Sequence, residues 1–432
     1  MTNQICAVVN PDATQCTHDA VEKGVCAEHA HYYKGQNGEI GFNLIVKNEE
    51  TVLEKCLSSI RPHCDEIVVT DTGSEDGTIP IALRYADKVL YHEWQNSFSE
   101  ARNFSLQYSR AQMLGWIDAD EYLTPESQPL LRPMIKIALR RDIQTIFCPL
   151  HSELSDQRVS RHFLPKFFRR GTGHFEAIVH NQLIHSQPTA VEAITFWHTG
   201  YNLDDEKMDK KRKRTSGLLL KQLETKPDDV FAIMNLARCY MTGSEYKLSE
   251  EWVDKGLALP SCKGSIREML LYNKAMCAMA EGEYEDVEKA CWESLGINDS
   301  NLDMLFVLGW AYTNMGYQAQ AIVIFNRYIQ VHKGQGVGFN LLIVDFWSAF
   351  PQLYHFLTLN YRKLGIPEKA LHYSVQAVIE NEYNAHLWKQ LCFDYLKAEN
   401  EGSIVSTIHG AIDRGIADSA MLRELGRLNK PL

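Results

Sequence analysis

Short apolar runs alternate with stretches of helical spacing between residues 40 and 205, and this alternation constrains the fold of the 432-residue chain most strongly. The apolar runs stand at 42–46, 67–70, 88–91 and 114–117, with helical patterns between them near 53–60, 79–85 and 98–109. A β-α-β-α order of this kind predicts an α/β domain with a mostly parallel, doubly wound (Rossmann-like) sheet. The near-continuous apolar runs also fit strands that are buried on both faces.

Acidic residues follow three of these runs at the point where each one ends. Glu49 comes after the first run, Asp71 after the second, and Asp118 and Asp120 after the fourth. In open parallel sheets, ligands bind outside the carboxyl ends of the strands. Two carboxylates at i and i+2 of an extended segment point the same way, which suits a hard divalent cation such as Mg²⁺ or Mn²⁺. An Asp-x-Asp pair is also common as a helix cap or in a solvated loop, but its position here favours a metal site.

Several longer motifs occur in a fixed order around these acids. They read FNLIVKNEE at 42–50, DEIVVTDTGSEDGT at 65–78, WQNSFSEARNFSL at 94–106, LGWIDADEYL at 114–123, KFFRR at 166–170, HFEAIVH at 174–180 and WHTGY at 197–201. Together they resemble an inverting family 2 glycosyltransferase of the GT-A fold. The layout, with helical repeats after the transfer domain, is similar to that of the bacteriocin S-glycosyltransferases.

The resemblance implies roles for residues at the nucleotide end of the site. Glu49 and Asp71 match positions that hold the nucleoside of a nucleotide-sugar, and Ser74 shapes the loop beside them. Arg102 and Asn103 match an Ala-Arg-Asn motif that lies beside the nucleotide and its diphosphate. The structural alternatives are a turn that caps the next helix for Ser74 and a surface ion pair for Arg102.

The resemblance also implies a metal centre and a displacement mechanism. Asp118 and Asp120 match the metal and diphosphate site, and His198 matches a histidine that can complete it; the alternative for His198 is a packed structural side chain. The metal would be Mn²⁺ or Mg²⁺ and the donor a UDP-sugar. The metal and Arg102 would neutralise charge on the leaving diphosphate while the acceptor attacks the anomeric carbon.

The general base is the least defined part of this mechanism. Related enzymes often read Val-His-Glu where this chain reads Val-His-Asn at 179–181, and an amide cannot act as a base. The candidates that remain are Glu121, Glu176, His174 and His180. We favour Glu176, and place it with Asp120 and His180 in the predicted catalytic set. A thiol acceptor would need less help, because a pKa of about 8.5 leaves some thiolate at neutral pH.

The first 35 residues contain few large aliphatic side chains and have cysteines at regular spacing. Cys6, Cys16, Cys26 and His29 form a plausible four-ligand set for a structural Zn²⁺, and His18 or His31 could replace one of them. The alternative is free thiols in a loosely attached arm. Residues 1–40 contain two basic and five acidic residues, which argues against phosphate binding by this segment.

Glycines recur through the last 227 residues and indicate helical repeats. Gly243, Gly282, Gly316, Gly365 and Gly402 stand 34 to 49 residues apart within amphipathic patterns. A helix, a glycine turn and a second helix near this period resemble tetratricopeptide repeats, and the sequence KGQGVGFN at 333–340 reads as an inserted loop. The aromatic residues Trp310, Tyr312, Tyr361 and Trp388 are expected in the repeat core. The basic run at 210–214 is either a solvated helix face or a site of attraction for a diphosphate or an acidic acceptor.

We therefore predict a zinc-binding module at 1–35, a GT-A domain at 40–205 and a repeat domain at 206–432. The expected activity is transfer of a sugar to a peptide or protein held by the repeats. The alternatives are transfer to modified phage DNA, which the net charge of −11 disfavours, and a non-catalytic scaffold. Neither a membrane span nor a signal peptide is evident, so a cytoplasmic location is expected. The oligomeric state is open, with a dimer as one option.

Overall fold

The computed structural model describes residues 6–20, 26–29, 38–154, 158–179, 181–199, 205–334, 343–397 and 401–416. The chain divides into two compact units, one of residues 1–239 with 337–343 and one of residues 240–336 with 344–432. The first unit includes α5 (Asp205–Thr225) and most of α6 (Val230–Thr242), two helices that the sequence grouped with the repeats. The three domain boundaries read from the sequence stay predictions.

The first unit is built on a nine-stranded sheet. Its strand order is β3-β2-β1-β4-β7-β6-β11-β5, and β10 pairs with β6. The strands are β1 (Ile40–Val46), β2 (Glu66–Asp71), β3 (Lys88–Tyr91), β4 (Met113–Trp116), β5 (Glu121–Leu123), β6 (Thr145–Glu153), β7 (Val159–Arg169), β10 (Thr189–Val191) and β11 (Phe196–His198). β1 is parallel to β2 and to β4, β2 is parallel to β3, and β6 is parallel to β10 and to β11, which confirms the predicted mostly parallel sheet.

The other half of the sheet is mixed. β7 runs antiparallel to both β4 and β6, and β11 runs antiparallel to β5. A separate two-stranded sheet consists of β8 (His174–Glu176) and β9 (Gln182–Ile184). The fold therefore joins a parallel half to a mixed half that the apolar runs did not reveal, in which β10 and β11 are parallel to β6.

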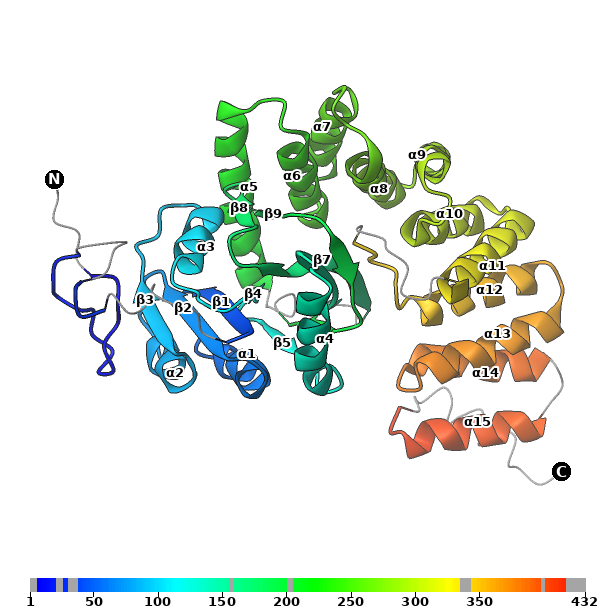
Figure 1. Ribbon diagram of the computed structural model, residues 1–432. Coiled ribbons are helices and arrows are strands. Elements are labelled where there is room, and N and C mark those ends of the chain that lie inside the picture. The colour runs from blue at the N-terminus through cyan, green and yellow to red at the C-terminus, as the bar shows by residue number, and fades with distance from the viewer. Residues whose placement is uncertain are drawn as a thin grey trace. The chain divides into compact units, whose positions relative to one another are not determined.

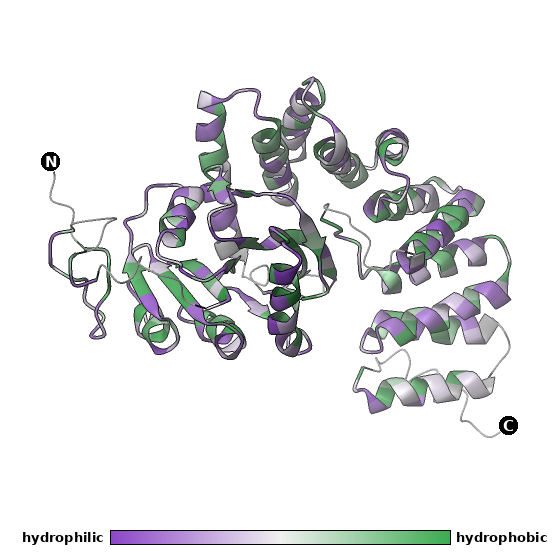
Figure 2. Cartoon of the chain, viewed as in Figure 1, coloured by the Kyte–Doolittle hydropathy of each residue, from purple (hydrophilic) through white to green (hydrophobic). Residues whose placement is uncertain are grey.

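Helices cover both faces of the parallel half (Figure 1). α1 (Leu53–Ile60), α2 (Thr78–Tyr85) and α4 (Gln128–Arg140) lie on one face, and α3 (Phe98–Leu106) lies on the other. A short 3-10 helix, η2 (Arg61–His63), follows α1. The central strands are strongly hydrophobic (Figure 2), which follows from burial between two helical layers.

Two local features fix α3 and β4 in place. Asn43 of β1 is buried and accepts a hydrogen bond from Ser109 Oγ at 2.6 Å, so the segment after α3 is tied to the central strand. Gly115 of β4 lies so close to Phe167 that an added Cβ would meet the ring at 2.7 Å. Only glycine permits this approach, which brings β7 and β4 together beneath the site.

The second unit contains consecutive antiparallel helices. They are α7 (Tyr246–Leu257), α8 (Gly264–Glu281), α9 (Tyr284–Ile297), α10 (Leu302–Met315), α11 (Gln318–Gly334), α12 (Phe350–Lys363), α13 (Pro367–Glu380), α14 (Ala385–Lys397) and α15 (Glu401–Asp413). Each helix packs against the next, most extensively in the pairs α8–α9, α10–α11 and α12–α13. These pairs confirm the predicted tetratricopeptide-like architecture.

Glycines make three of the turns within these pairs. Gly282, Gly316 and Gly365 adopt left-handed conformations with φ of 79°, 80° and 71°. Gly243 also lies in a turn, between α6 and α7, although there Ser244 takes the left-handed conformation, whereas Gly402 lies in the first turn of α15 and departs from the pattern.

The remaining expectations for this unit have mixed outcomes. The four aromatic residues Trp310, Tyr312, Tyr361 and Trp388 pack in or against the core of the second unit, as predicted. The first two residues of the expected inserted loop at 333–340 end α11, and the rest lie outside the described residues. Within the part of the chain that the structure describes, each helix is too short or too polar to cross a bilayer. The cytoplasmic location stays a prediction.

Candidate functional site

The loops after β1 and β2 meet at one edge of the sheet and hold each other. The backbone N–H of Asn48 donates to Ser74 Oγ at 2.9 Å, and the backbone N–H of Glu75 donates to Asn48 Oδ1 at 2.8 Å. Asn48 adopts a left-handed conformation with φ of 56°, which turns the chain sharply at the end of the strand. Ser74 therefore shapes this edge as a partner of the neighbouring loop.

Asp71 ends β2 and is 1% exposed. Its Oδ2 accepts hydrogen bonds from the backbone N–H groups of Gly73 at 2.9 Å and Ser74 at 3.1 Å. The carboxylate therefore sets the shape of the turn in which the following residues lie. A contact of Asp71 with a nucleoside stays a prediction.

Arg102 and Asp118 form the centre of the site. Arg102 on α3 donates to Asp118 Oδ1 at 2.5 Å, and its guanidinium lies 4.6 Å from the ring centroid of Trp116 and 5.3 Å from that of Phe175. Its Nε is buried without a hydrogen-bond partner among the described residues. The Nε–H of Arg102 thus lacks a partner in the described part of the chain, and the guanidinium lies beside the exposed edge of the Asp118 carboxylate. A cationic donor in this state suits a bound anion.

The charge state of Asp118 follows from its neighbours. Burial would raise its pKa, but the positive charges of Arg102 and then Lys166 outweigh that effect and lower the pKa of Asp118 below its ordinary value. Asp118 therefore stays ionised at neutral pH, as a metal or diphosphate site requires.

Asp120 and His198 form the second pair at this edge. His198 Nε2 lies 3.1 Å from Asp120 Oδ2, and Thr199 donates from its backbone N–H and its hydroxyl to the Asp120 carbonyl oxygen. Burial would lower the pKa of His198, but the hydrogen bond and the charge of Asp120 raise it. Two ligands of an octahedral ion with bonds of about 2.1 Å stand about 3.0 Å apart, so this pair fits adjacent positions around one cation.

The third expected ligand does not complete a compact cluster with this pair. Among the described residues, the groups of three or more potential metal ligands within 4.8 Å of one another do not include Asp118, Asp120 and His198. Asp118 Oδ1 instead accepts a hydrogen bond from Arg102. The carboxylate–imidazole pair thus fits a divalent cation, while Asp118 is held by the arginine.

A buried lysine beneath the acids was not assigned a role from the sequence. Lys166 on β7 is fully buried, donates to Glu121 Oε2 at 2.5 Å and lies 3.9 Å from the ring centroid of Trp116. The backbone N–H of Asp118 also donates to Glu121 Oε2 at 3.2 Å. Glu121 therefore supports the loop that carries Asp118 and is not placed to act as a general base. The lysine of the KFFRR motif was the feature of the sequence that could have revealed this role.

Glu49 is close enough to the acidic pair to respond to it. Burial, then the charges of Asp120 and Asp118, raise the pKa of Glu49 from its ordinary value of 4.5 to about 7. Lys211 of α5 acts in the opposite direction on the same group. One lysine of the basic run therefore lies within electrostatic reach of the site, which favours the functional interpretation of that run over a purely solvated face.

Other predicted residues lie elsewhere or have other partners. Both ends of the Asn103 amide are bound to the backbone of Phe175, with both distances 2.8 Å, so Asn103 anchors β8 to α3. Glu176 is exposed and pairs with His174 at 3.0 Å, on the side of β8 opposite to buried Phe175. The structure does not bring Glu176 to the acids, and its role as the base stays a prediction. His180 lies outside the described residues.

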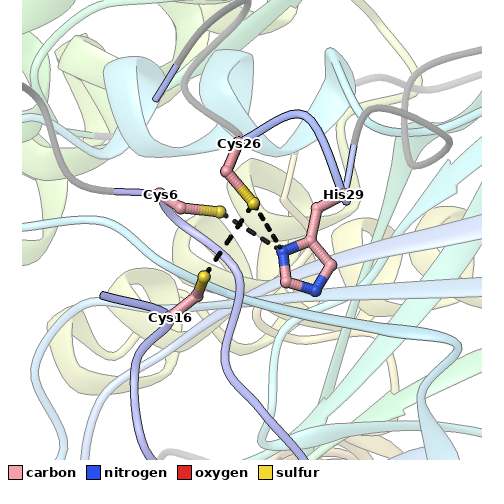
Figure 3. Close-up of side chains that lie close together, drawn as sticks. All are labelled: Cys6, Cys16, Cys26 and His29. Atoms are coloured by element: carbon pink, nitrogen blue, oxygen red, sulfur yellow. Dashed lines mark hydrogen bonds between the residues drawn. The ribbon is translucent and has the colours of Figure 1, made fainter. Parts of the chain in front are cut away.

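The four proposed zinc ligands converge near the N-terminus. Cys6, Cys16, Cys26 and His29 offer three sulfurs and one ring nitrogen that all lie within 4.8 Å of one another (Figure 3). These residues precede β1 and form a second cluster, separate from the acidic edge.

Comparisons with known proteins found one family model and several relatives. The family model described as "Glycosyl transferase family 2" matches residues 44–183. A TPR repeat-containing protein of Synechococcus elongatus is 27% identical over 260 residues, which cover 57% of this chain and 63% of that protein. The SPbeta prophage-derived glycosyltransferase SunS of Bacillus subtilis is 28% identical over 208 residues, which cover 46% of this chain and 49% of SunS. The chain thus matches less than two thirds of either relative's length.

The solved structures similar to this chain include tetratricopeptide repeat proteins. One is YrrB, described as a TPR protein with an unusual peptide-binding site, which is 15% identical and has a TM-score of 0.38. The match covers 48% of this chain and 97% of YrrB. A TM-score of this size supports no inference about ligands, so the repeat assignment depends on the helix pairs themselves.

Proposed function

We propose that the protein is a metal-dependent, inverting glycosyltransferase, because its residues 44–183 match the model of glycosyl transferase family 2. It takes a sugar from a nucleotide-sugar, specifically a UDP-sugar, and transfers it to a peptide or protein side chain. The observation that carries the proposal is the arrangement of Arg102 at the end of the parallel strands. Its buried Nε has no partner among the described residues, and its guanidinium lies against the rings of Trp116 and Phe175 beside Asp118.

Arg102 is the group that receives the diphosphate. A guanidinium that lies against Trp116 and Phe175 and donates to Asp118 keeps its position when the anion arrives, so little ordering entropy is lost on binding. As the bond to the sugar breaks, negative charge grows on the diphosphate and its attraction to this fixed cation increases. The interaction is therefore stronger in the transition state than in the ground state, which is the requirement for catalysis.

Asp120 and His198 are the residues that would hold the divalent cation. Their oxygen and nitrogen atoms stand 3.1 Å apart, and Asp118 offers its second carboxylate oxygen from the same loop. A bound Mn²⁺ or Mg²⁺ would supply charge neutralisation for the leaving diphosphate. Lys166 and Glu121 hold the Asp118 loop from below, because the Asp118 backbone N–H and the lysine ammonium share the Glu121 carboxylate.

The nucleoside is the part of the donor that the β1 and β2 loops would bind. Asp71 fixes the turn at 72–74, and Ser74 ties that turn to the loop after β1. Lys211 adds positive charge near Glu49, which favours a donor that carries two phosphates. These contacts support a nucleotide-sugar as the donor. That its nucleoside is uridine is inferred from the resemblance to family 2 glycosyltransferases alone.

The acceptor assignment is supported by the second unit. Its consecutive antiparallel helices are of the kind that presents an extended surface for peptides. Glu176 stays our predicted base for a hydroxyl acceptor, although it lies exposed beside His174. A thiol acceptor would ease this requirement, because part of it is already ionised near neutral pH.

A donor-hydrolysis assay tests the proposal. The full-length protein is incubated with a panel of nucleotide-sugars and Mn²⁺, and release of nucleoside diphosphate is followed in a coupled assay. We expect a UDP-sugar to be hydrolysed slowly without an acceptor, and Asp120→Ala to lower that rate about 100-fold or more. Glu54→Ala serves as the control, because Glu54 is an exposed acid of α1 that pairs with Arg84.

The results of this assay distinguish the proposed function from its alternatives. Hydrolysis of no nucleotide-sugar would make the protein a non-catalytic scaffold. Full activity of Asp120→Ala in the presence of EDTA would remove the metal from the mechanism. Once the donor is known, mass spectrometry of peptides and DNA oligonucleotides incubated with it identifies the acceptor, and transfer only to DNA would contradict the peptide assignment.

A further inference from the structure

The N-terminal cysteines lie on a small backbone frame that positions them together. Cys6 and Cys16 come from facing segments, because the backbone N–H of Cys6 donates to His18 O at 2.9 Å and that of Cys16 donates to Val8 O at 2.8 Å. Cys26 and His29 stand at the two ends of one tight turn, closed by a hydrogen bond from His29 N to Cys26 O at 3.1 Å. All four side chains point to a common centre (Figure 3).

The distances within this cluster are those of a tetrahedral zinc site. Cys16 Sγ and Cys26 Sγ are 3.9 Å apart, and His29 Nδ1 lies 3.5 Å from Cys6 Sγ and 3.3 Å from Cys26 Sγ. Tetrahedral Zn²⁺ with Zn–S of about 2.3 Å and Zn–N of about 2.0–2.1 Å places two sulfurs about 3.8 Å apart, and a sulfur and a nitrogen about 3.6 Å apart. A disulfide would need about 2.05 Å between two sulfurs, so the cluster fits a shared cation and not a bond.

The cluster is enclosed, and the segment around it has little other core. Cys6, Cys16 and Cys26 are 0%, 4% and 3% exposed. Among the described residues, Val8 is the one aliphatic side chain that the segment adds to this cluster; the members besides the cysteines come from β2, β3, α3 and the turn after α3. The described part of the segment also buries Ala7 and Val9, but these side chains are small, and a structural metal orders a segment with so small a core.

We propose that Cys6, Cys16, Cys26 and His29 bind one structural Zn²⁺, and that this ion clasps the N-terminal segment onto the free edge of β3. β3 is the terminal strand in the sheet order. Val8 bridges to Leu90 in antiparallel fashion, Val9 N donates to Val89 O at 2.9 Å, and Tyr91 N donates to Ala7 O at 2.6 Å. The clasp thus covers backbone groups that an edge strand otherwise exposes.

The same clasp supports the helix that carries Arg102. The ligand cysteines pack in one cluster with Val68 of β2, Leu90 of β3 and Tyr108, with Phe104 of α3 against it. The residues of the clasp precede the family match, which begins at residue 44. We therefore expect zinc to stabilise β3 and α3 from outside the transfer domain, with no part in the chemistry.

A competing ligand set shares one cysteine with this site. His18, Cys26 and Glu28 also lie within 4.8 Å of one another, but His18 and Glu28 are exposed side chains. That set has one thiol and two exposed ligands, whereas structural zinc sites are closed and rich in thiolate. The experiment below separates the two sets.

Zinc content of the purified full-length protein is the first measurement. Produced with added zinc and purified without chelator, the wild type should contain about one zinc per chain, and Cys26→Ser should contain less than a fifth of that. His18→Ala and Cys239→Ser should retain full zinc, because neither residue belongs to the proposed set. His29→Ala should lose the metal and His29→Cys should keep it, since a fourth thiolate can replace the imidazole.

Two spectroscopic readouts keep the test independent of folding failure and of activity. The cobalt-substituted wild type should show thiolate-to-metal charge transfer and the intense visible bands of a tetrahedral ion. Removal of zinc should speed hydrogen exchange of the Tyr91 amide, which donates to the clasp, by at least tenfold. A wild-type protein that binds neither zinc nor cobalt would refute the site, and so would loss of zinc in His18→Ala. Unchanged exchange at Tyr91 after zinc removal would refute the clasp.

Discussion

Replacing Glu49 by glutamine should make the metal-free protein more stable at alkaline pH. Glu49 has a pKa of about 7, raised by burial and by the charges of Asp120 and Asp118. An acid whose pKa is raised on folding stabilises the folded state only while it is protonated. Its contribution is therefore present below the ordinary value of 4.5 and is lost as the pH rises through about 7.

The size of the effect follows from the two pKa values. Each pKa unit corresponds to about 1.4 kcal/mol, so ionised Glu49 costs the folded state about 3 kcal/mol at pH 8. Glu49→Gln cannot ionise and escapes this cost. The difference in unfolding free energy between Glu49→Gln and the wild type should rise by about 3 kcal/mol from pH 4.5 to pH 8. Added Mn²⁺ should shrink the difference, because a cation at Asp120 offsets the repulsion.

Hydrogen exchange with mass spectrometry, followed along a urea series, measures this change in the unfolding free energy of the first unit. Peptides from β1, β2 and β4 report the unfolding of the first unit alone, which a single probe of a two-unit chain does not. The measurements are made in EDTA at several pH values. Glu54→Gln, an exposed acid of α1, should change stability by less than about 0.5 kcal/mol. Parallel pH profiles for wild type and Glu49→Gln would show that Glu49 does not lie beside the acidic pair.

Two further predictions concern buried charges. Lys166→Met should destabilise the first unit by about 3–5 kcal/mol, because it leaves the Glu121 carboxylate buried and unpaired. Adding Glu121→Gln to this variant should restore most of the lost stability. A cost of Lys166→Met below about 1 kcal/mol in urea unfolding would contradict the buried pair. His355 has a pKa lowered from 6.5 to about 4, first by burial, so the second unit should lose up to about 3 kcal/mol as the pH falls from 6.5 to 4. His355→Gln should flatten this acid limb, whereas His372→Gln, at an exposed position, should leave it unchanged.

The parallel half of the fold was predictable because each of its strands is a continuous apolar run. β1, β2, β3 and β4 fall within two residues of the runs read from the sequence. β7 escaped prediction because its sequence, VSRHFLPKFFR, carries charges and a proline where a buried strand is expected to be apolar. Lys166 is tolerated there only because Glu121 neutralises it, and that partner lies 45 residues away.

The sequence predicted the candidate site only where the spacing of two residues determines the direction in which their side chains point. The pair Asp118 and Asp120 follows from a two-residue spacing after a strand, and the structure places both at the expected edge. Spacing cannot show that Arg102 occupies one oxygen of Asp118, or that the Asn103 amide binds the backbone of Phe175. These contacts depend on how α3 packs against distant strands, which no local pattern encodes.

The most direct test of the account is calorimetric titration of the full-length protein with UDP, with and without Mn²⁺. We predict binding that requires Mn²⁺ and weakens at least tenfold in Arg102→Ala, because loss of the guanidinium removes the cation that faces the diphosphate; tenfold corresponds to about 1.4 kcal/mol. Asp120→Ala should abolish the Mn²⁺ dependence. Equal affinity for UDP in the wild type and in both variants would contradict the assignment of this edge as the donor site.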